Sequence, residues 1–210
     1  VCFKVKTPAV TYALITANIL IGALLFLYSI KSGISYNRLL TDFGAKENFR
    51  ILSGEYLRFV TPIFLHADFI HLLINCYSLF IIGAGVERIF GRLKFTAVYF
   101  AAGILGNLAS FMLSPGPGVG ASGAIFGLLG ALLYFGIEKP VLFKAYFGYN
   151  VLATIFVNLA YGFTKAGIDN YAHIGGLIGG FLVSGAVSKP ERPRRLLNRH
   201  LYLAAAVILA

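Results

Sequence analysis

Long apolar runs constrain this sequence more than any other feature. Several of them continue for about 20 residues with no Asp, Glu, Lys or Arg, and about 20 helical residues cross the 30 Å hydrocarbon core of a bilayer. Only 12% of the 210 residues are charged, whereas an average soluble domain has about 25%. The sequence therefore predicts an all-α polytopic membrane protein.

Divided into stretches of about 20 residues, the apolar runs predict a six-helix transmembrane bundle in a single domain that covers residues 1–210. A shorter run at 201–210 predicts a truncated seventh span, in a 6+1 arrangement. The loop 31–69 is rich in Ile, Leu and Phe, and we expect it to fold onto the membrane surface. The six spans are expected at about 9–30, 70–86, 93–113, 119–137, 140–163 and 171–188.

The net charge of +10 predicts an orientation in the bilayer. With the N-terminus in the cytoplasm, the cytoplasmic segments hold twice as many Lys and Arg as the outer ones, so we expect a cell-membrane protein with that orientation. No basic stretch is interleaved with aromatic or polar side chains that could read bases, so no nucleic-acid partner is expected. The two cysteines, Cys2 and Cys76, form no zinc-binding or disulfide pattern, and we expect no metal or cofactor.

Four polar side chains lie near the outer ends of three of these spans. His71 and Asn75 begin the second span, Ser122 the fourth and His173 the sixth. Such residues are costly in hydrocarbon and usually have a function there. The spacing of His71 and Asn75 is i, i+4, which puts both on one face of a helix. The sequence therefore predicts one polar layer that opens toward the outer face.

These residue types suit acyl transfer. A serine hydroxyl needs an imidazole to take its proton, and the resulting oxyanion needs fixed donors. Ser122 and His173 could supply the first pair, and Asn75, His71 and the Ser122 N–H could supply the donors. The segment around Ser122 is not a hydrolase nucleophile elbow, because residue 124 is Ala where the G-x-S-x-G motif requires Gly.

Glycine spacing explains how the fourth and sixth spans could bring Ser122 and His173 together. Both spans carry a GxxxG pair, which lets helix backbones approach closely. The pairs are Gly123 with Gly127, and Gly176 with Gly180.

Each feature also has an ordinary structural explanation. A serine in a membrane helix often bonds the carbonyl of its own helix, and GxxxG is often only packing. Asn75, His66, His71 or His173 could bridge helices. Cys76 is a poor alternative nucleophile, since no basic residue lies one helical turn away. Asp169 could orient the imidazole as a third triad member or be a solvated charge near a helix start.

Taken together, these residues resemble the rhomboid family of intramembrane serine proteases. Gly120-Ala121-Ser122-Gly123-Ala124 resembles its GxSG segment, Ala172-His173-Ile174-Gly175-Gly176 with Gly180 resembles its AHxxGxxxG segment, and His71-Leu72-Leu73-Ile74-Asn75 resembles its HxxxN helix. Glu87-Arg88 lies where the family has a polar pair, and Leu57-Arg58 stands where it often has Trp-Arg. The resemblance covers about 54–180. It implies a Ser–His dyad in which Phe126 stacks on the imidazole in place of a triad carboxylate.

We therefore expect a serine endopeptidase that cleaves transmembrane segments of other membrane proteins within the lipid bilayer. Its site would open to the outer face, and the sequence specifies no oligomeric state. Two alternatives remain: a catalytically inactive scaffold that binds client helices, and a small transporter. The scaffold would be expected to lack the serine or the histidine. The transporter would more often carry intramembrane acids or repeats, and this sequence has neither.

Overall fold

The computed structural model describes residues 7–188, and its regular structure in that range is helical apart from one isolated β-bridge between Lys46 and Gly118. The expected all-α architecture is therefore confirmed. The expected partial span at 201–210 lies outside the described residues. The elements are α1 (Ala9–Ser32), α2 (Tyr36–Asp42), α3 (Asn48–Leu52), η1 (Tyr56–Phe59), η2 (Thr61–Phe64), α4 (Phe69–Ser78), η3 (Leu79–Gly83, a π-helical turn), α5 (Ala84–Phe90), α6 (Arg92–Leu113), α7 (Ser122–Glu138), α8 (Pro140–Tyr146), α9 (Asn150–Thr164) and α10 (Asn170–Val187).

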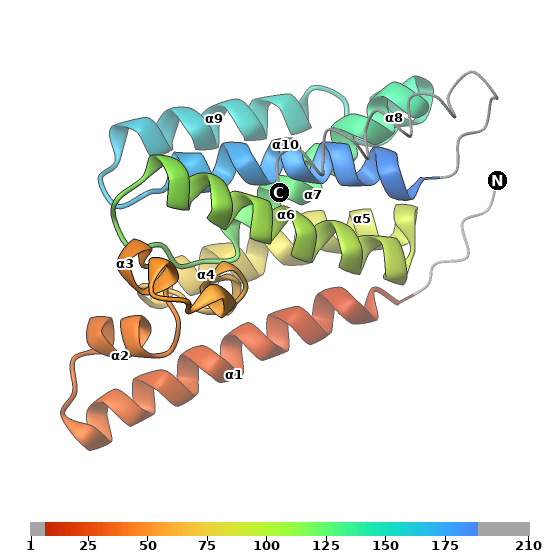
Figure 1. The fold of residues 1–210 in the computed structure, drawn as a ribbon. Coiled ribbons are helices and arrows are strands. Elements are labelled where there is room, and N and C mark those ends of the chain that lie inside the picture. The colour runs from red at the N-terminus through yellow and green to blue at the C-terminus, as the bar shows by residue number, and fades with distance from the viewer. Residues whose placement is uncertain (1–6, 189–210) are drawn as a thin grey trace.

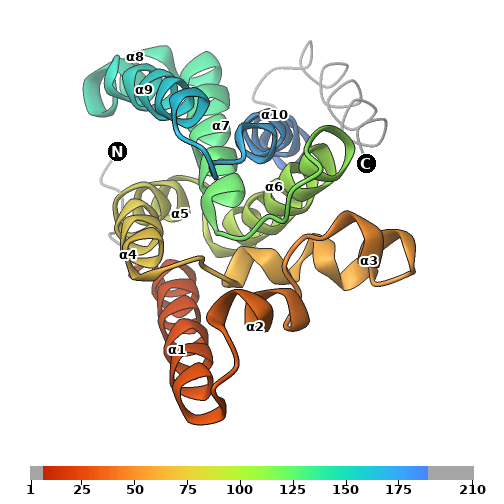
Figure 2. The ribbon, with the colours of Figure 1, turned by 90° about the vertical axis from the view of Figure 1, so that its left-hand side faces the viewer.

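Helix α7 is the central helix of the bundle. It is apolar on all sides and most of its residues are buried, as expected for a helix that is surrounded by others. It packs against α6 and α10, and Figure 2 shows these helices around it together with α4, α5 and α9. Ser122 is the first residue of α7, so the core of the bundle fixes its position.

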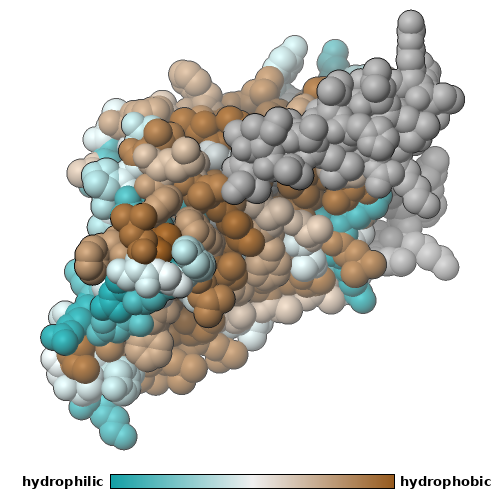
Figure 3. All heavy atoms as spheres, viewed as in Figure 1, coloured by the Kyte–Doolittle hydropathy of each residue, from teal (hydrophilic) through white to brown (hydrophobic). Residues whose placement is uncertain are grey.

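The outer surface of the bundle is apolar, as a bilayer requires. Helix α1 lies at the edge of the bundle in Figure 1, and its Leu20 and Leu24 are 56% and 66% exposed. Figure 3 shows a broad hydrophobic band across the same face, with hydrophilic side chains gathered near the ends of the helices. This distribution fits an integral multi-pass membrane protein.

Two buried charged residues hold the first helix and the long loop in place. The carboxylate of Glu87 in α5 accepts hydrogen bonds from the backbone N–H groups of Val10 and Thr11, so it caps α1 from another helix. In the loop, Arg58 is buried and donates to the carbonyls of Thr41 and Ala45 at 2.7 and 2.8 Å. The loop that separates α1 from α4 is therefore folded, with α2 and α3 packed within it.

The helices correspond only partly to the six expected spans. Three are long and apolar enough to cross a bilayer in the described range: α1, the continuous α4–α5 segment Phe69–Phe90, and α6. The apolar run expected as a span at 140–163 is interrupted, because α8 and α9 meet at a 69° bend around Gly148, whose φ of +53° is left-handed. With that bent pair the count reaches four, and helix α7 has 17 residues. The total of six spans therefore stays a prediction.

The backbones of α7 and α10 touch where both carry glycine. A Cβ added to Gly176 would overlap the carbonyl oxygen of Gly123, and one added to Gly180 would overlap that of Gly127. These are the two GxxxG pairs of the sequence, and the structure brings them face to face. Any side chain larger than hydrogen at Gly176 or Gly180 would separate the two helices.

We predict that Gly176→Ala lowers the free energy of unfolding in detergent by about 1–3 kcal/mol, because the added methyl group meets backbone that cannot move aside. Gly85→Ala in α5 is the matched control, since its Cβ would meet Phe147 at 3.9 Å, an ordinary contact. Thermal and denaturant unfolding measure both variants. Equal stability of Gly176→Ala and the control would contradict the close packing.

Candidate active site

Ser122 and His173 form a hydrogen-bonded pair at the ends of α7 and α10. The distance between Ser122 Oγ and His173 Nε2 is 2.9 Å. Ser122 is half-buried, and His173 is 8% exposed. The structure thus brings together the two side chains that the sequence selected, and the serine hydroxyl bonds the imidazole rather than a carbonyl of its own helix.

Phe126 covers one face of the His173 ring. The two ring centroids lie 4.3 Å apart with an interplanar angle of 12°, which is a stacked arrangement. Phe126 follows Ser122 by one turn of α7 and is itself buried. One helix therefore supplies both the group that bonds the imidazole edge and the group that fixes the plane of the ring.

The ring of His71 lies beside Ser122 because residue 120 has no side chain. A Cβ at Gly120 would stand 2.8 Å from His71 Nε2 and 3.6 Å from Ser122 Oγ. The φ of Gly120 is +129°, which other residues rarely adopt. Both the backbone angle and the lack of space therefore require glycine here, and the His71 ring lies against this glycine, two residues before the serine.

Two side chains hold the start of α4. Asp68 caps this helix, and its Oδ1 accepts the His71 N–H at 2.8 Å. Asn75 is buried, and its Nδ2 donates to the His71 carbonyl at 2.9 Å. The bond of Asn75 lies within its own helix, so Asn75 bridges no helices among the described residues. Its amide nitrogen keeps a second N–H.

Asp169 does not complete a triad. Its Oδ1 accepts the backbone N–H of Ala172 at 3.0 Å, which caps α10, and its Oδ2 accepts the hydroxyl of Ser110. His173 Nδ1 is buried and has no hydrogen-bond partner within residues 7–188. The triad interpretation of Asp169 is therefore wrong, whereas the expected position near a helix start is correct: Asp169 caps α10 and is half-buried.

His66 is a buried neighbour of the site. It is 1% exposed, and its ring meets that of His71 edge to face with centroids 5.3 Å apart. Burial, with a smaller effect of His71, lowers the pKa of His66 to about 3, so its imidazole is neutral at physiological pH. His66 therefore packs against the His71 ring as an uncharged side chain.

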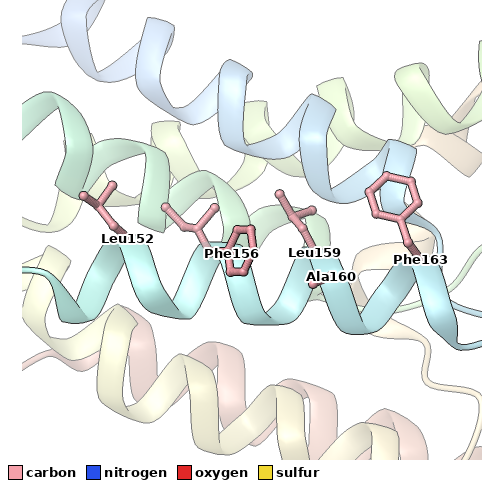
Figure 4. Close-up of a pocket in the computed structure, with 6 residues that line it drawn as sticks. Leu152, Phe156, Leu159, Ala160 and Phe163 are labelled. Carbon is pink, nitrogen blue, oxygen red and sulfur yellow. The ribbon is translucent and has the colours of Figure 1, made fainter.

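No other feature of the described residues offers competing chemistry. Cys76 is buried and free, and no group of three His, Cys, Asp or Glu side chains in the described part of the chain could hold a metal ion. A hollow on the surface of α9 is lined only by apolar side chains, five of which Figure 4 labels, and it contains none of the site residues.

The geometry at the N-terminal ends of α4, α7 and α10 can support nucleophilic attack on a carbonyl. A hydroxyl touches an imidazole that can take its proton, and the ring is held by stacking. The N–H of Ser122 belongs to the first turn of α7, where backbone donors have no partner within the helix. His71 and Asn75 lie on the adjacent helix as further donors.

Comparison with known proteins finds similarity to rhomboid proteins. Residues 53–190 match the rhomboid domain family. The chain is 44% identical over 98% of its length to the rhomboid protease GluP of Bacillus subtilis, and 31% identical over 99% of its length to the rhomboid protease AarA of Providencia stuartii. It is 38% identical over 69% of its length to the putative rhomboid protease YdcA of B. subtilis. The chain spans 40% of the length of GluP, 74% of YdcA and 82% of AarA.

We predict an energetic coupling of about 0.5–1.5 kcal/mol between Phe126 and His173, because stacked rings are worth that much beyond the area they bury. Unfolding free energies of Phe126→Leu, His173→Ala and the double variant give the coupling. Ser184, about three turns further along α10, supplies the control. Phe126→Leu and Ser184→Ala should add within about 0.5 kcal/mol, and the same additivity for Phe126 and His173 would contradict the stack.

Proposed function

This chain belongs to the rhomboid family, and from that premise we propose that it is an intramembrane serine endopeptidase that cleaves transmembrane segments of other membrane proteins. The hydrogen bond of 2.9 Å between Ser122 and His173 carries the proposal. It is the arrangement that turns a weakly nucleophilic hydroxyl into an attacking group.

The reaction follows from this pair. Ser122 Oγ attacks the scissile carbonyl while His173 Nε2 takes its proton, and the carbonyl oxygen becomes an oxyanion. The imidazolium then gives the proton to the leaving amine, so the peptide bond breaks and an acyl-enzyme remains. A water attacks the acyl group, His173 takes its proton and returns one to Ser122, and the second product leaves.

Three nearby donors support the proposal that the site holds the oxyanion. The Ser122 N–H lies at the start of α7, Nε2 of His71 points at Gly120 beside the serine, and Asn75 keeps a free N–H. The Ala67 N–H approaches His71 Nδ1 at 3.4 Å, which favours the tautomer whose proton is on Nε2. That tautomer makes His71 a donor toward the reacting oxygen.

The substrate class follows from the place of the site. A fully hydrogen-bonded helix hides its carbonyls from attack, so a cleavable segment must carry small or helix-destabilising residues near the scissile bond. The first turns of α4 and α10 lie at the end of the bundle where α2 and α3 lie (Figure 1). With the N-terminus in the cytoplasm of a cell, as the charge distribution favours, this end opens to the outer face.

The alternatives differ in observable ways. An inactive scaffold would have no need of an activated hydroxyl, yet Ser122 and His173 are bonded here. A transporter would be expected to carry acids in the middle of its spans, whereas Glu87 caps α1 and Asp169 caps α10. Labelling by a serine-directed fluorophosphonate separates a protease from both alternatives.

We predict that Ser122→Ala and His173→Ala each abolish cleavage of a model transmembrane substrate in detergent, because either change removes the activated nucleophile. Ser184→Ala is the matched control, since it deletes a buried hydroxyl of α10 remote from the pair. The control should cleave and take up the fluorophosphonate normally. Normal cleavage by either dyad variant would overturn the assignment.

We predict that Asn75→Ala lowers kcat by about 10- to 10³-fold with little change in KM, because the bond to the oxyanion forms mainly in the transition state. Asn158→Ala is the control, since Asn158 Nδ2 also donates to a carbonyl of its own helix, that of Thr154, at 2.8 Å. It should keep full activity. Cleavage kinetics and melting temperatures distinguish catalysis from helix stability.

His71→Ala should resemble Asn75→Ala, and the double variant should lose less than the product of the two losses, as expected for donors that act on one atom. An unchanged kcat in both single variants would remove the two residues from the mechanism.

A further inference from the structure

Lys46 is a lysine with no exposed surface, in the loop between α1 and α4. Its Nζ donates to the carbonyls of Ser114 and Gly116 at 2.8 and 2.7 Å. Its backbone pairs with Gly118 through bonds of 2.8 and 2.9 Å. All three partners belong to the segment 114–121 that joins α6 to α7, so one residue of the first loop holds the segment that ends at Ser122.

An ammonium group without contact with water is costly unless other groups compensate its charge. Burial lowers the pKa of Lys46, and the carboxylate of Asp169 opposes that shift. Two carbonyls and a nearby carboxylate therefore replace the water that Lys46 has lost.

Gly118 lies beside the carboxylate of Asp169 and the base of the Lys46 side chain. A Cβ at this glycine would stand 3.5 Å from Asp169 Oδ2, 3.6 Å from Lys46 Cβ and 3.7 Å from Ser110 Oγ. Ser110 in turn donates to Asp169. The buried Lys46 and Ser110 and the half-buried Asp169 form one group around the segment, which we call the Lys46–Ser110–Asp169 cluster.

The cluster connects the two segments that lead into the active pair. Gly118 lies four residues before Ser122 along the chain, and Asp169 caps α10 four residues before His173. A shift of Gly118 against Asp169 would therefore change the distance between the hydroxyl and the imidazole.

We propose that Lys46 and Asp169 are positioning residues for the Ser122–His173 pair: they lock the segment 114–121 to the start of α10 without touching the reacting atoms. This inference rests on the proposed protease function. A misplacement of about 1 Å can cost about 100-fold in rate, so a remote charge that fixes this register affects turnover rather than substrate binding.

The test replaces Lys46 by Met, which keeps the unbranched side chain up to the position of Cε and removes its charged end. We expect kcat to fall by about 10- to 100-fold while KM changes by less than about 3-fold, at a temperature well below the melting point of each variant. Lys31→Met is the matched control, because Lys31 is an exposed lysine at the end of α1, and it should keep wild-type kinetics.

The second charge gives an internal check. Lys46→Met leaves the Asp169 carboxylate without its opposite charge, and adding Asp169→Asn removes that imbalance while Asn still caps α10. The double variant should recover about 3- to 10-fold in kcat over Lys46→Met alone. If kcat of the double variant falls by the product of the two single-variant losses, the coupling is overturned. A loss of about 10⁴-fold in Asp169→Asn alone would also overturn it, because that loss would assign Asp169 a direct catalytic role.

Hydrogen exchange separates the failure of this inference from that of the proposed function. Amides of residues 114–121 should exchange faster in Lys46→Met than in wild type, whether or not the protein cleaves any substrate. If Lys46→Met does not fold, Asp169→Asn alone should show the faster exchange and a kcat loss of about 3- to 10-fold. Unchanged exchange and kcat in the folded variants would overturn the proposal.

Discussion

The backbone contact between α7 and α10 is the interaction on which the rest of the structure depends. In a bilayer the lipid tails are as apolar as the helix surfaces, so helices associate through close packing and not through removal of apolar surface from water. Gly123 against Gly176 and Gly127 against Gly180 leave no side chain between the two backbones. Ser122 precedes the first of these contacts and His173 lies one turn before its partner glycine. Their hydrogen bond is therefore a consequence of helix packing.

Carboxylates at helix starts solve a second problem of the membrane. Unpaired backbone N–H groups are costly where water is scarce, and Asp68, Asp169 and Glu87 each satisfy such groups at the start of a helix. Each carboxylate is in turn stabilised by the donors and by the helix dipole. Two of the three caps lie just before His71 and His173. The carboxylate caps that begin these helices thus also fix the positions of the polar side chains of the site.

Sequence reasoning identified Ser122, His173 and the glycine pairs because length, charge and spacing are local properties of the chain. The contacts that it missed are non-local. The cluster of Lys46, Ser110 and Asp169 joins a loop, a helix end and another helix start, and no spacing in the sequence links them. The bend between α8 and α9 was missed because an apolar run does not reveal a left-handed glycine at residue 148. The Asp68 cap had a local signal, an Asp three residues before His71, that went unused.

A stacked phenyl ring in place of a triad carboxylate fits the location of the site. A buried carboxylate beside the imidazole would need further donors to offset its desolvation, whereas the unpartnered Nδ1 of a neutral His173 costs about 1–3 kcal/mol. Phe126 orients the ring without adding a charge. The imidazolium that forms during attack then has no carboxylate bonded to it among the described residues, and the nearest new negative charge is the oxyanion itself. Stabilising that oxyanion therefore also stabilises the imidazolium, which makes the donors on α4 as important to turnover as the base on α10.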